Sequence, residues 1–191
     1  MPLAPGQILR VDAAGTRLEP CNPGTQGQVI LYNGSGIPNP ANGSVVNANM
    51  QYGSMWADEV NQLITVGAVN IYYQIPGSIT DGLGSVAFTF QNARELKCNA
   101  AGIYVVHYSL TLEVTAANQD LSACVMVNAT VQSNTTNHAT AGSGPVKNCN
   151  PSGAGIITLA VNDLVRLAAA NHTAVNSIRM RHANLTIWRI A

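Results

Sequence analysis

Residues 102–114, GIYVVHYSLTLEV, constrain the fold of this chain more than any other stretch. Every second side chain from Tyr104 to Val114 is apolar, which makes six in succession at a period of two residues. A β-strand returns a side chain to the same face at that period. The opposite face is polar from His107 onward. We therefore expect one long strand that covers a core with one face only.

Further segments rich in β-branched and aromatic residues also favour strands, and clusters of glycine, asparagine and proline separate them. The expected strands are residues 62–75, 85–92, 121–133, 154–161, 163–171 and 184–190. The one place where a single helical turn could form is 58–64. About eight to ten short strands without intervening helices predict an all-β fold, an antiparallel β-sandwich or jelly roll.

Residues 1–45 have a different composition from the rest of the chain. They hold six of the nine prolines and many glycines, which disfavours a helix. Two phrases that begin with Gly-Gln, at residues 6 and 27, repeat at an offset of 21 residues and contain the short extended pieces QILRV and QVILY. We predict an extended N-terminal arm over residues 1–45 and a jelly-roll domain over residues 46–191.

The arm needs the surface of a partner in order to hold one defined conformation. Ordering the backbones of about 45 residues costs more free energy than the burial of the arm's roughly one dozen sizeable apolar side chains returns. We expect its two extended pieces to add as strands to exposed edges of a partner, where main-chain hydrogen bonds supply much of the affinity. The candidate contact residues are Gln7, Ile8, Leu9, Val11, Gln28, Val29, Ile30 and Tyr32.

The low content of charged residues argues against two classes of partner, nucleic acids and membrane surfaces. Charged residues make up only 9% of the chain, against a usual value of about 25%, and the formal net charge is zero. The chain therefore offers no basic field for nucleic acid and no polybasic run for a membrane surface. No secretory signal is visible at the start, and no apolar run reaches membrane-spanning length. A surface of Asn, Thr, Ser and Gln suits contacts inside an assembly.

Catalytic motifs are missing from the sequence. GSGP (142–145) and SGAG (152–155) contain serine between glycines but not the Gly-x-Ser-x-Gly elbow, and there is no dinucleotide or phosphate loop. His107, on the polar face of its strand, favours a surface or interface role. The cluster Arg179, Arg181, His182 and Arg189 could bind an anion, although a solvated strand end is the favoured interpretation. We predict that the chain is not an enzyme and has no cofactor.

The four cysteines, Cys21, Cys98, Cys124 and Cys149, are widely separated in the sequence. A zinc site usually shows ligands in close pairs, and the histidines are scattered too. We therefore expect no metal site and interpret the cysteines as free, buried thiols, with their redox state left open. Cys124 alternates with apolar neighbours in ACVMV, which predicts a core-facing position.

The order of four phrases resembles the tumour-necrosis-factor-like jelly roll, a superfamily that includes the globular head of the first complement component. The phrases are AAGIYVVHYSLTLEV, SACVMVNATV, SGAGIITLAVNDLVRL and the closing NLTIWRI, and they span roughly residues 50–191. Gly102-Ile103-Tyr104 fits the family's Gly-x-Tyr strand opening. LAVNDLVRL (159–167) fits its Leu-x-x-Gly-Asp-x-Val phrase, with Asn162 where the family usually has glycine; asparagine tolerates the same left-handed turn.

The resemblance implies trimers packed about a threefold axis. Bacteriophages use similar jelly rolls in capsid decoration (cement) proteins, head fibres and tail-fibre tips, and the opening Gly-Gln phrases look like the shafts and arms of such proteins. We expect a homotrimeric decoration protein on the outer surface of the virion head, which stabilises the shell and whose arm binds the major capsid protein. The alternative is the receptor-binding tip of a tail or head fibre, with a host-surface glycan as a possible ligand. A sugar-binding or complement-like module is a further rival.

Overall fold

The computed structural model describes residues 8–11, 18–21, 51–145 and 147–191. The chain divides into two units, Met1–Asn49 and Met50–Ala191. The predicted boundary after residue 45 falls in the stretch 22–50, which lies outside the described residues.

The first unit contains a β-hairpin backbone. β1 (Ile8–Val11) pairs antiparallel with β2 (Leu18–Cys21), with Ile8 opposite Cys21 and Val11 opposite Leu18. The first Gly-Gln phrase therefore contributes β1, and the pairing partner of β1 lies a few residues further along the same arm. The second phrase lies outside the described residues.

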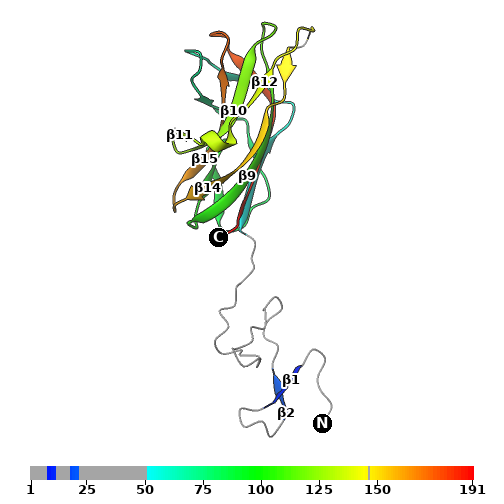
Figure 1. Cartoon of the computed structure of the whole chain (residues 1–191), viewed down its shortest axis with the longest axis vertical. Coiled ribbons are helices and arrows are strands. Elements are labelled where there is room, and N and C mark those ends of the chain that lie inside the picture. Colours follow the sequence, from blue (N-terminus) through cyan, green and yellow to red (C-terminus); the bar gives the residue numbers. More distant parts are fainter. Residues whose placement is uncertain (1–7, 12–17, 22–50, 146) are drawn as a thin grey trace. The chain divides into compact units, whose positions relative to one another are not determined.

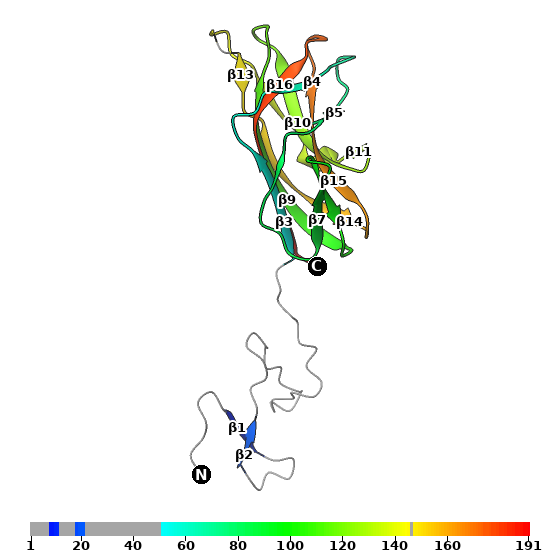
Figure 2. The ribbon, with the colours of Figure 1, turned by 180° about the vertical axis from the view of Figure 1, so that it is seen from behind.

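The second unit, which we call the head, consists of two sheets in which every pairing is antiparallel (Figures 1 and 2). The β10 sheet contains β5 (Tyr73–Gln74), β7 (Phe88–Gln91), β8 (Glu95–Cys98), β10 (Asp120–Val127), β11 (Thr130–Val131), β12 (Asn137–Thr140) and β15 (Leu164–Asn171). The β9 sheet contains β3 (Tyr52–Ala57), β4 (Gln62–Ile64), β6 (Thr80–Asp81), β9 (Gly102–Glu113), β13 (Asn148–Cys149), β14 (Ser152–Leu159) and β16 (Ile178–Arg189).

From β8 onward the chain crosses repeatedly between the two sheets. It passes from β8 to β9, back to β10, on to β13 and β14, back to β15 and finally to β16. Such crossing between two antiparallel sheets is the connectivity of a jelly roll. The one helical element of the described residues is a short 3₁₀ turn, η1 (Ser133–Thr135), and no described helix has the length and apolarity to cross a membrane. The predicted all-β antiparallel sandwich is confirmed.

The core lies between the sheets and follows the alternation of β9. The predicted inward face from Tyr104 to Val114 is buried throughout, and it packs against inward residues of β10 such as Leu121 and Val125. The hydroxyl of Tyr108 lies 2.7 Å from the carbonyl oxygens of both Ala123 and Thr135. A buried tyrosine needs such a partner for its hydroxyl, so Tyr108 joins the core to the edge of the β10 sheet.

Three local predictions are wrong. Residues 62–75 form two short strands, β4 and β5, because the chain turns between them and Asn70 takes a positive φ of 65°. The strand predicted over residues 85–92 is shorter, because β7 begins only at Phe88 and Val86, which precedes it, is 91% exposed. Residues 58–61 form a bend that leads into β4, and no helical turn forms there.

Cys124 is also placed differently from the prediction. It is fully buried, yet it lies outside the core cluster, because Ala123 and Val125 on either side of it point into the core. It faces the other side of the β10 sheet, beside Ala168 of β15. The segment before β5 reaches this side, since Tyr72 Oη lies 2.7 Å from Ser122 Oγ.

One end of the head, which we call the base, is where β3 begins and β16 ends. Tyr52 lies opposite Trp188, and the amide of Arg189 donates a hydrogen bond to the carbonyl of Gln51 at 2.8 Å. The first described residue of the head, Gln51, therefore lies at the base.

Candidate functional site

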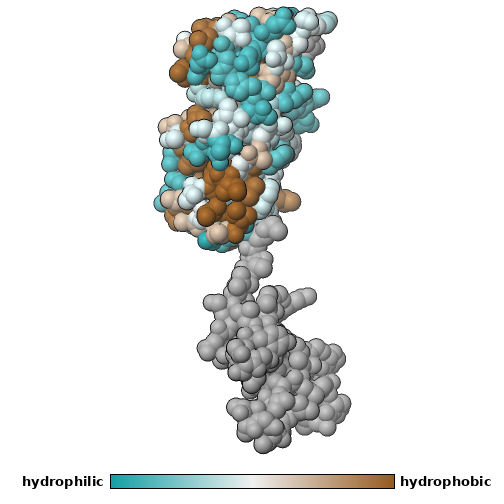
Figure 3. Space-filling view, in the orientation of Figure 1, coloured by the Kyte–Doolittle hydropathy of each residue, from teal (hydrophilic) through white to brown (hydrophobic). Residues whose placement is uncertain are grey.

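The outer face of the β9 sheet is the face that points away from the β10 sheet. Strand register places one row of large side chains across it near the base: Ile156 of β14, Val105 of β9, Trp188 of β16 and Tyr52 of β3. Neighbours in such a row are about 4.8 Å apart. We call it the apolar row. Ile156 is 57% exposed, and Figure 3 shows an apolar patch over the lower ends of β9 and β14.

Towards the other end, the outer face becomes polar without becoming charged. The next two rows contain Ala154, His107, Thr186 and Ser54, then Ser152, Ser109, Asn184 and Trp56. None of these eight residues is Asp, Glu, Lys or Arg. His107 is exposed, as predicted for a surface or interface histidine.

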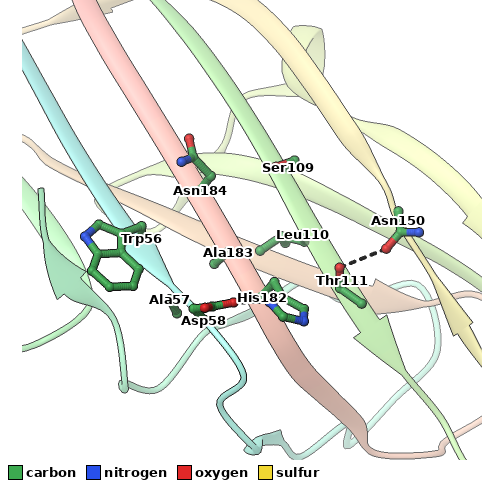
Figure 4. Close-up of a pocket in the computed structure, with 10 residues that line it drawn as sticks. All are labelled: Trp56, Ala57, Asp58, Ser109, Leu110, Thr111, Asn150, His182, Ala183 and Asn184. Carbon is green, nitrogen blue, oxygen red and sulfur yellow. Dashed lines mark hydrogen bonds and ion pairs between the residues drawn. The ribbon is translucent and has the colours of Figure 1, made fainter.

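The second of these rows borders a depression of about 520 Å³ that extends towards Asp58, Thr111 and His182 (Figure 4). Trp56 forms one side of it and is 44% exposed. Asn184 and His182 of β16 form the floor, and Ser109 and Thr111 of β9 line the far side.

Four of the polar side chains that line the depression already interact with one another in two pairs. His182 Nδ1 lies 2.8 Å from Asp58 Oδ1, and Thr111 donates to Asn150 at 2.8 Å. Ser109 lies opposite Asn184 rather than opposite His182, so the register does not pair this serine with a base. The Trp56 ring, the Ser109 hydroxyl and the Asn184 amide face outward. They can contact a neutral, hydrogen-bonding ligand or another protein face.

A second polar cluster lies on the β10 sheet. His172 Nε2 is 2.6 Å from Ser122 Oγ, and His172 Nδ1 is 2.7 Å from Asn70 Oδ1. His138 stacks on His172, with 4.6 Å between ring centroids. A Ser–His–Asn chain resembles an activated nucleophile, but Ser122 is fully buried and a substrate carbonyl cannot reach its oxygen. The cluster therefore ties the segment before β5 to β10 and to the end of β15.

This cluster was not predicted from the sequence. Ser122 is 50 residues from His172, and Asn70 is 102 residues from it, so no local spacing connects them. Burial, and then the charge of His138, lower the pKa of His172 below its ordinary 6.5, and Asp120 only partly opposes this.

The four basic residues that were considered as an anion site, the less favoured interpretation, do not come together. Arg179, Arg181 and His182 lie at one end of β16, and Arg189 lies at the other, at the base. Arg181 Nε is 2.7 Å from Glu113, and Arg179 donates to Asn61 at 2.8 Å. An anion site made of all four residues is therefore wrong, because a strand of twelve residues separates its ends.

The predicted contact residues of the arm fall mostly outside the described part of the chain. Ile8, Leu9 and Val11 belong to β1, where the backbone alone is described. Gln7, Gln28, Val29, Ile30 and Tyr32 lie outside the described residues. Their contact with a partner stays a prediction.

The cysteines of the head match the interpretation as free thiols. Cys98, Cys124 and Cys149 are buried and unpaired, while the side chain of Cys21 is not described. Burial raises the pKa of Cys124 to about 12 and, with a contribution from Asp120, that of Cys149 to about 11. Within residues 51–145 and 147–191, no three His, Cys, Asp or Glu side chains are grouped so that they could hold a metal ion.

Comparison with known proteins finds similar folds only. No protein-family model matches the chain, and no curated protein sequence matches it. Among solved structures, the Eiger TNF from S. frugiperda is 11% identical with a TM-score of 0.49, and the match covers 74% of this chain and 94% of that one. Murine APRIL at pH 8.0 is 10% identical with a TM-score of 0.47, over 73% and 100% of the two chains. The globular domain of zebrafish complement 1qA is 12% identical with a TM-score of 0.43, over 74% and 98%.

The likeness is one of fold. The jelly-roll assignment rests on the strand order of the chain itself.

Proposed function

We propose that this protein is a bacteriophage capsid decoration protein, which binds the outer surface of the head shell through its arm and stabilises the shell as a homotrimer. The observation that carries the proposal is the division of the chain into two units of different character. The head has a continuous buried core of its own. The proline- and glycine-rich arm has too little apolar surface to hold one shape alone, so its function lies in binding a partner.

The hairpin of β1 and β2 gives the arm a defined way to bind. An isolated two-stranded hairpin is only marginally stable in water. Among the described residues, β1 and β2 each pair along one edge only, with each other, and a strand of the major capsid protein can add to the other edge through main-chain hydrogen bonds. The second Gly-Gln phrase, 21 residues further along the sequence, supplies a second segment that can bind the same partner.

The outer face of the β9 sheet is the face we assign to subunit packing in the trimer. The apolar row supplies buried area, and the two polar rows beside it carry no Asp, Glu, Lys or Arg that packing would strip of water. A trimer presents three arms to the shell at once, so weak individual contacts combine through effective concentration. A clamp of this kind opposes the separation of shell subunits under internal pressure.

The location of the protein on its parent particle tests this function. Particles labelled with an antibody against the chain and viewed in negative stain should carry label over the whole head. Label confined to the tail would overturn the decoration function and favour the fibre alternative.

One observation favours that alternative, a receptor-binding fibre tip. Trp56 is 44% exposed and lies beside Asn184 and Ser109 in one row. An indole ring can stack on the apolar face of a sugar while an amide and a hydroxyl bond its hydroxyl groups. Host glycans would then quench or shift tryptophan fluorescence, and Trp56→Ala would abolish that response and reduce adsorption of particles to cells. A decoration protein predicts normal adsorption by the Trp56→Ala particles.

A further inference from the structure

The base of the head carries a group of exposed apolar side chains, which we call the base cluster. Val86 is 91% exposed, Leu83 80%, Val161 and Ile190 52% each, and Ile103 40%. Val86 and Leu83 are the most exposed large apolar residues in the described part of the chain. An exposed apolar group of this extent marks a contact surface more often than a solvated one.

Hydrogen bonds place the segments of the base cluster at the same end of the sandwich. The loop that carries Leu83 and Val86 is bound to the start of β3, because Ser85 N donates to Tyr52 O at 2.8 Å and Tyr52 N donates to Ser85 Oγ at 2.9 Å. The amide of Ile190 donates to the carbonyl of Ile103 at 2.8 Å.

The loop that carries Val161 joins the same end. Asn162 N donates to the carbonyl of Cys98 at 2.7 Å, and the neighbouring Asn99 donates its side-chain amide to the carbonyl of Val86 at 3.0 Å. The four segments that carry the base cluster therefore all lie at the same end of the sandwich.

The two most exposed side chains stand on a loop that is held in place. Gly82 N donates to Ser54 O at 3.1 Å, and Ser54 Oγ donates to the carbonyl of Leu83 at 2.8 Å. A Cβ added at Gly82 would lie 2.3 Å from Ser54 Oγ, so the loop approaches β3 as closely as glycine permits. A partner that covers Leu83 and Val86 would not have to order this loop, which favours binding.

Two charged side chains at the base are already satisfied within the head. Arg189 donates from Nε to the carbonyl of Ala191 at 2.8 Å and from Nη1 to Gln51 at 2.9 Å. Asp163 accepts from Asn128 at 2.9 Å and from the amide of Ala160 at 2.8 Å. A partner surface can cover them without leaving either charge unpaired.

We propose that the base cluster is a second contact surface of this protein, and that it packs against an apolar, uncharged patch of the same shell protein that the arm binds. The proposal rests on the proposed function. Gln51, the first described residue of the head, lies at the base, and the arm precedes it in the chain. Any surface that the arm holds is thereby kept near the base cluster at high effective concentration. The head then stands on the shell with its base inward.

The test compares two aspartate substitutions at the base with one at the opposite end, all in the full-length chain. Leu83→Asp and Val86→Asp place a carboxylate where the partner would bury an apolar group. Val175→Asp is the matched control, because Val175 is 58% exposed in the loop between β15 and β16, which lies at the other end. Binding to shells that lack the protein is measured by co-sedimentation, with Val86→Ser as a milder variant.

We expect Leu83→Asp and Val86→Asp to weaken shell binding at least tenfold, Val86→Ser to weaken it less, and Val175→Asp to bind like the unchanged chain. Equal binding by all variants, with binding still lost on removal of the arm, would overturn the base contact and leave the proposed function standing. Failure of the unchanged chain to bind shells would overturn both.

The same variants would also reveal whether the base cluster is covered by something other than the shell protein. A changed mass of Val86→Asp in sedimentation would mean that a second copy of the chain covers the base. A lower unfolding midpoint of free Val86→Asp would mean that a segment of the same chain covers it. Either result overturns the contact with the shell.

Discussion

At the scale of single residues, one buried ion pair stands out. Glu95 is 1% exposed, and its carboxylate lies 2.6 Å from Arg166 Nε, between β8 and β15. Burial raises the pKa of Glu95, but hydrogen bonds from Asn92, Arg166 and Gln91 and the charge of Arg166 outweigh it, so the pKa lies below the ordinary 4.5. The ionised carboxylate therefore stabilises the fold at neutral pH.

Glu95→Gln should lower the free energy of unfolding by about 3 kcal/mol at pH 7, because it leaves Arg166 without its counter-charge. A group with a lowered pKa contributes stability above its ordinary value and loses it as the pH falls below 4.5. The difference between the two chains, measured by urea unfolding, should therefore shrink by pH 3.5. An equal difference in the free energy of unfolding at pH 7 and at pH 3.5 would contradict this account. Adding Arg166→Met to Glu95→Gln should restore part of the loss.

The lowered pKa of His172 predicts a second way in which the stability of the fold depends on pH. Its pKa is lowered by burial and by His138, and less strongly raised by Asp120, so the folded chain favours the neutral ring. The unfolded chain takes up the proton first, and stability should fall as the pH drops from about 6.5. His172→Gln should flatten this fall of the thermal midpoint between pH 7 and pH 5. His107→Gln, on the other sheet, is the control and should keep the unchanged slope.

At the scale of elements, the glycines of β14 have a packing role. A Cβ at Gly153 would lie 2.8 Å from the carbonyl oxygen of Thr135 and 2.9 Å from the Tyr108 ring, and one at Gly155 would lie 2.7 Å from Thr135 Cγ2. The SGAG phrase therefore lets β14 pass close to η1.

Gly153→Val should lower the free energy of unfolding by about 1–3 kcal/mol, because the added methyl groups overpack the contact with η1. Ala129→Val is the matched control: Ala129 is exposed in the turn between β10 and β11, away from the outer face of the β9 sheet, so its change should stay within about 0.5 kcal/mol. Urea unfolding of both variants measures this. Equal effects of the two substitutions would argue against the packing role.

The same strands show how far the sequence predicts the fold. β9, β10, β15 and the second half of β16 follow from long alternating or continuous apolar runs, whereas the first half of β16, from Ile178, was not predicted because its sequence IRMRHA is rich in basic residues. β3, β8 and β12 were missed because each is short and includes polar residues, as in YGSMWA, where Gly53 is buried against Phe88. The depression beside Trp56 depends on the register of three strands that are distant in the sequence. No single segment encodes that register.

At the scale of the whole molecule, the trimer is the first claim to test. We expect a sedimentation mass three times that of the 20.0 kDa chain. Val105→Asp places a charge in the middle of the apolar row and should give a monomer at the same concentration, while Val175→Asp should keep the unchanged mass. A monomeric unchanged chain, or a Val105→Asp variant of unchanged mass, would contradict packing through this face.

The arm is the part of the molecule on which the proposed function depends most. The head holds its own core, so removal of residues 1–49 should leave it folded, with the circular dichroism of a β-sandwich and the oligomeric mass of the full chain. Co-sedimentation of this truncated chain with shells that lack the protein is the most direct test. We predict that the full chain binds and that the truncated chain, at the same concentration, does not. Undiminished binding by the truncated chain would contradict the account.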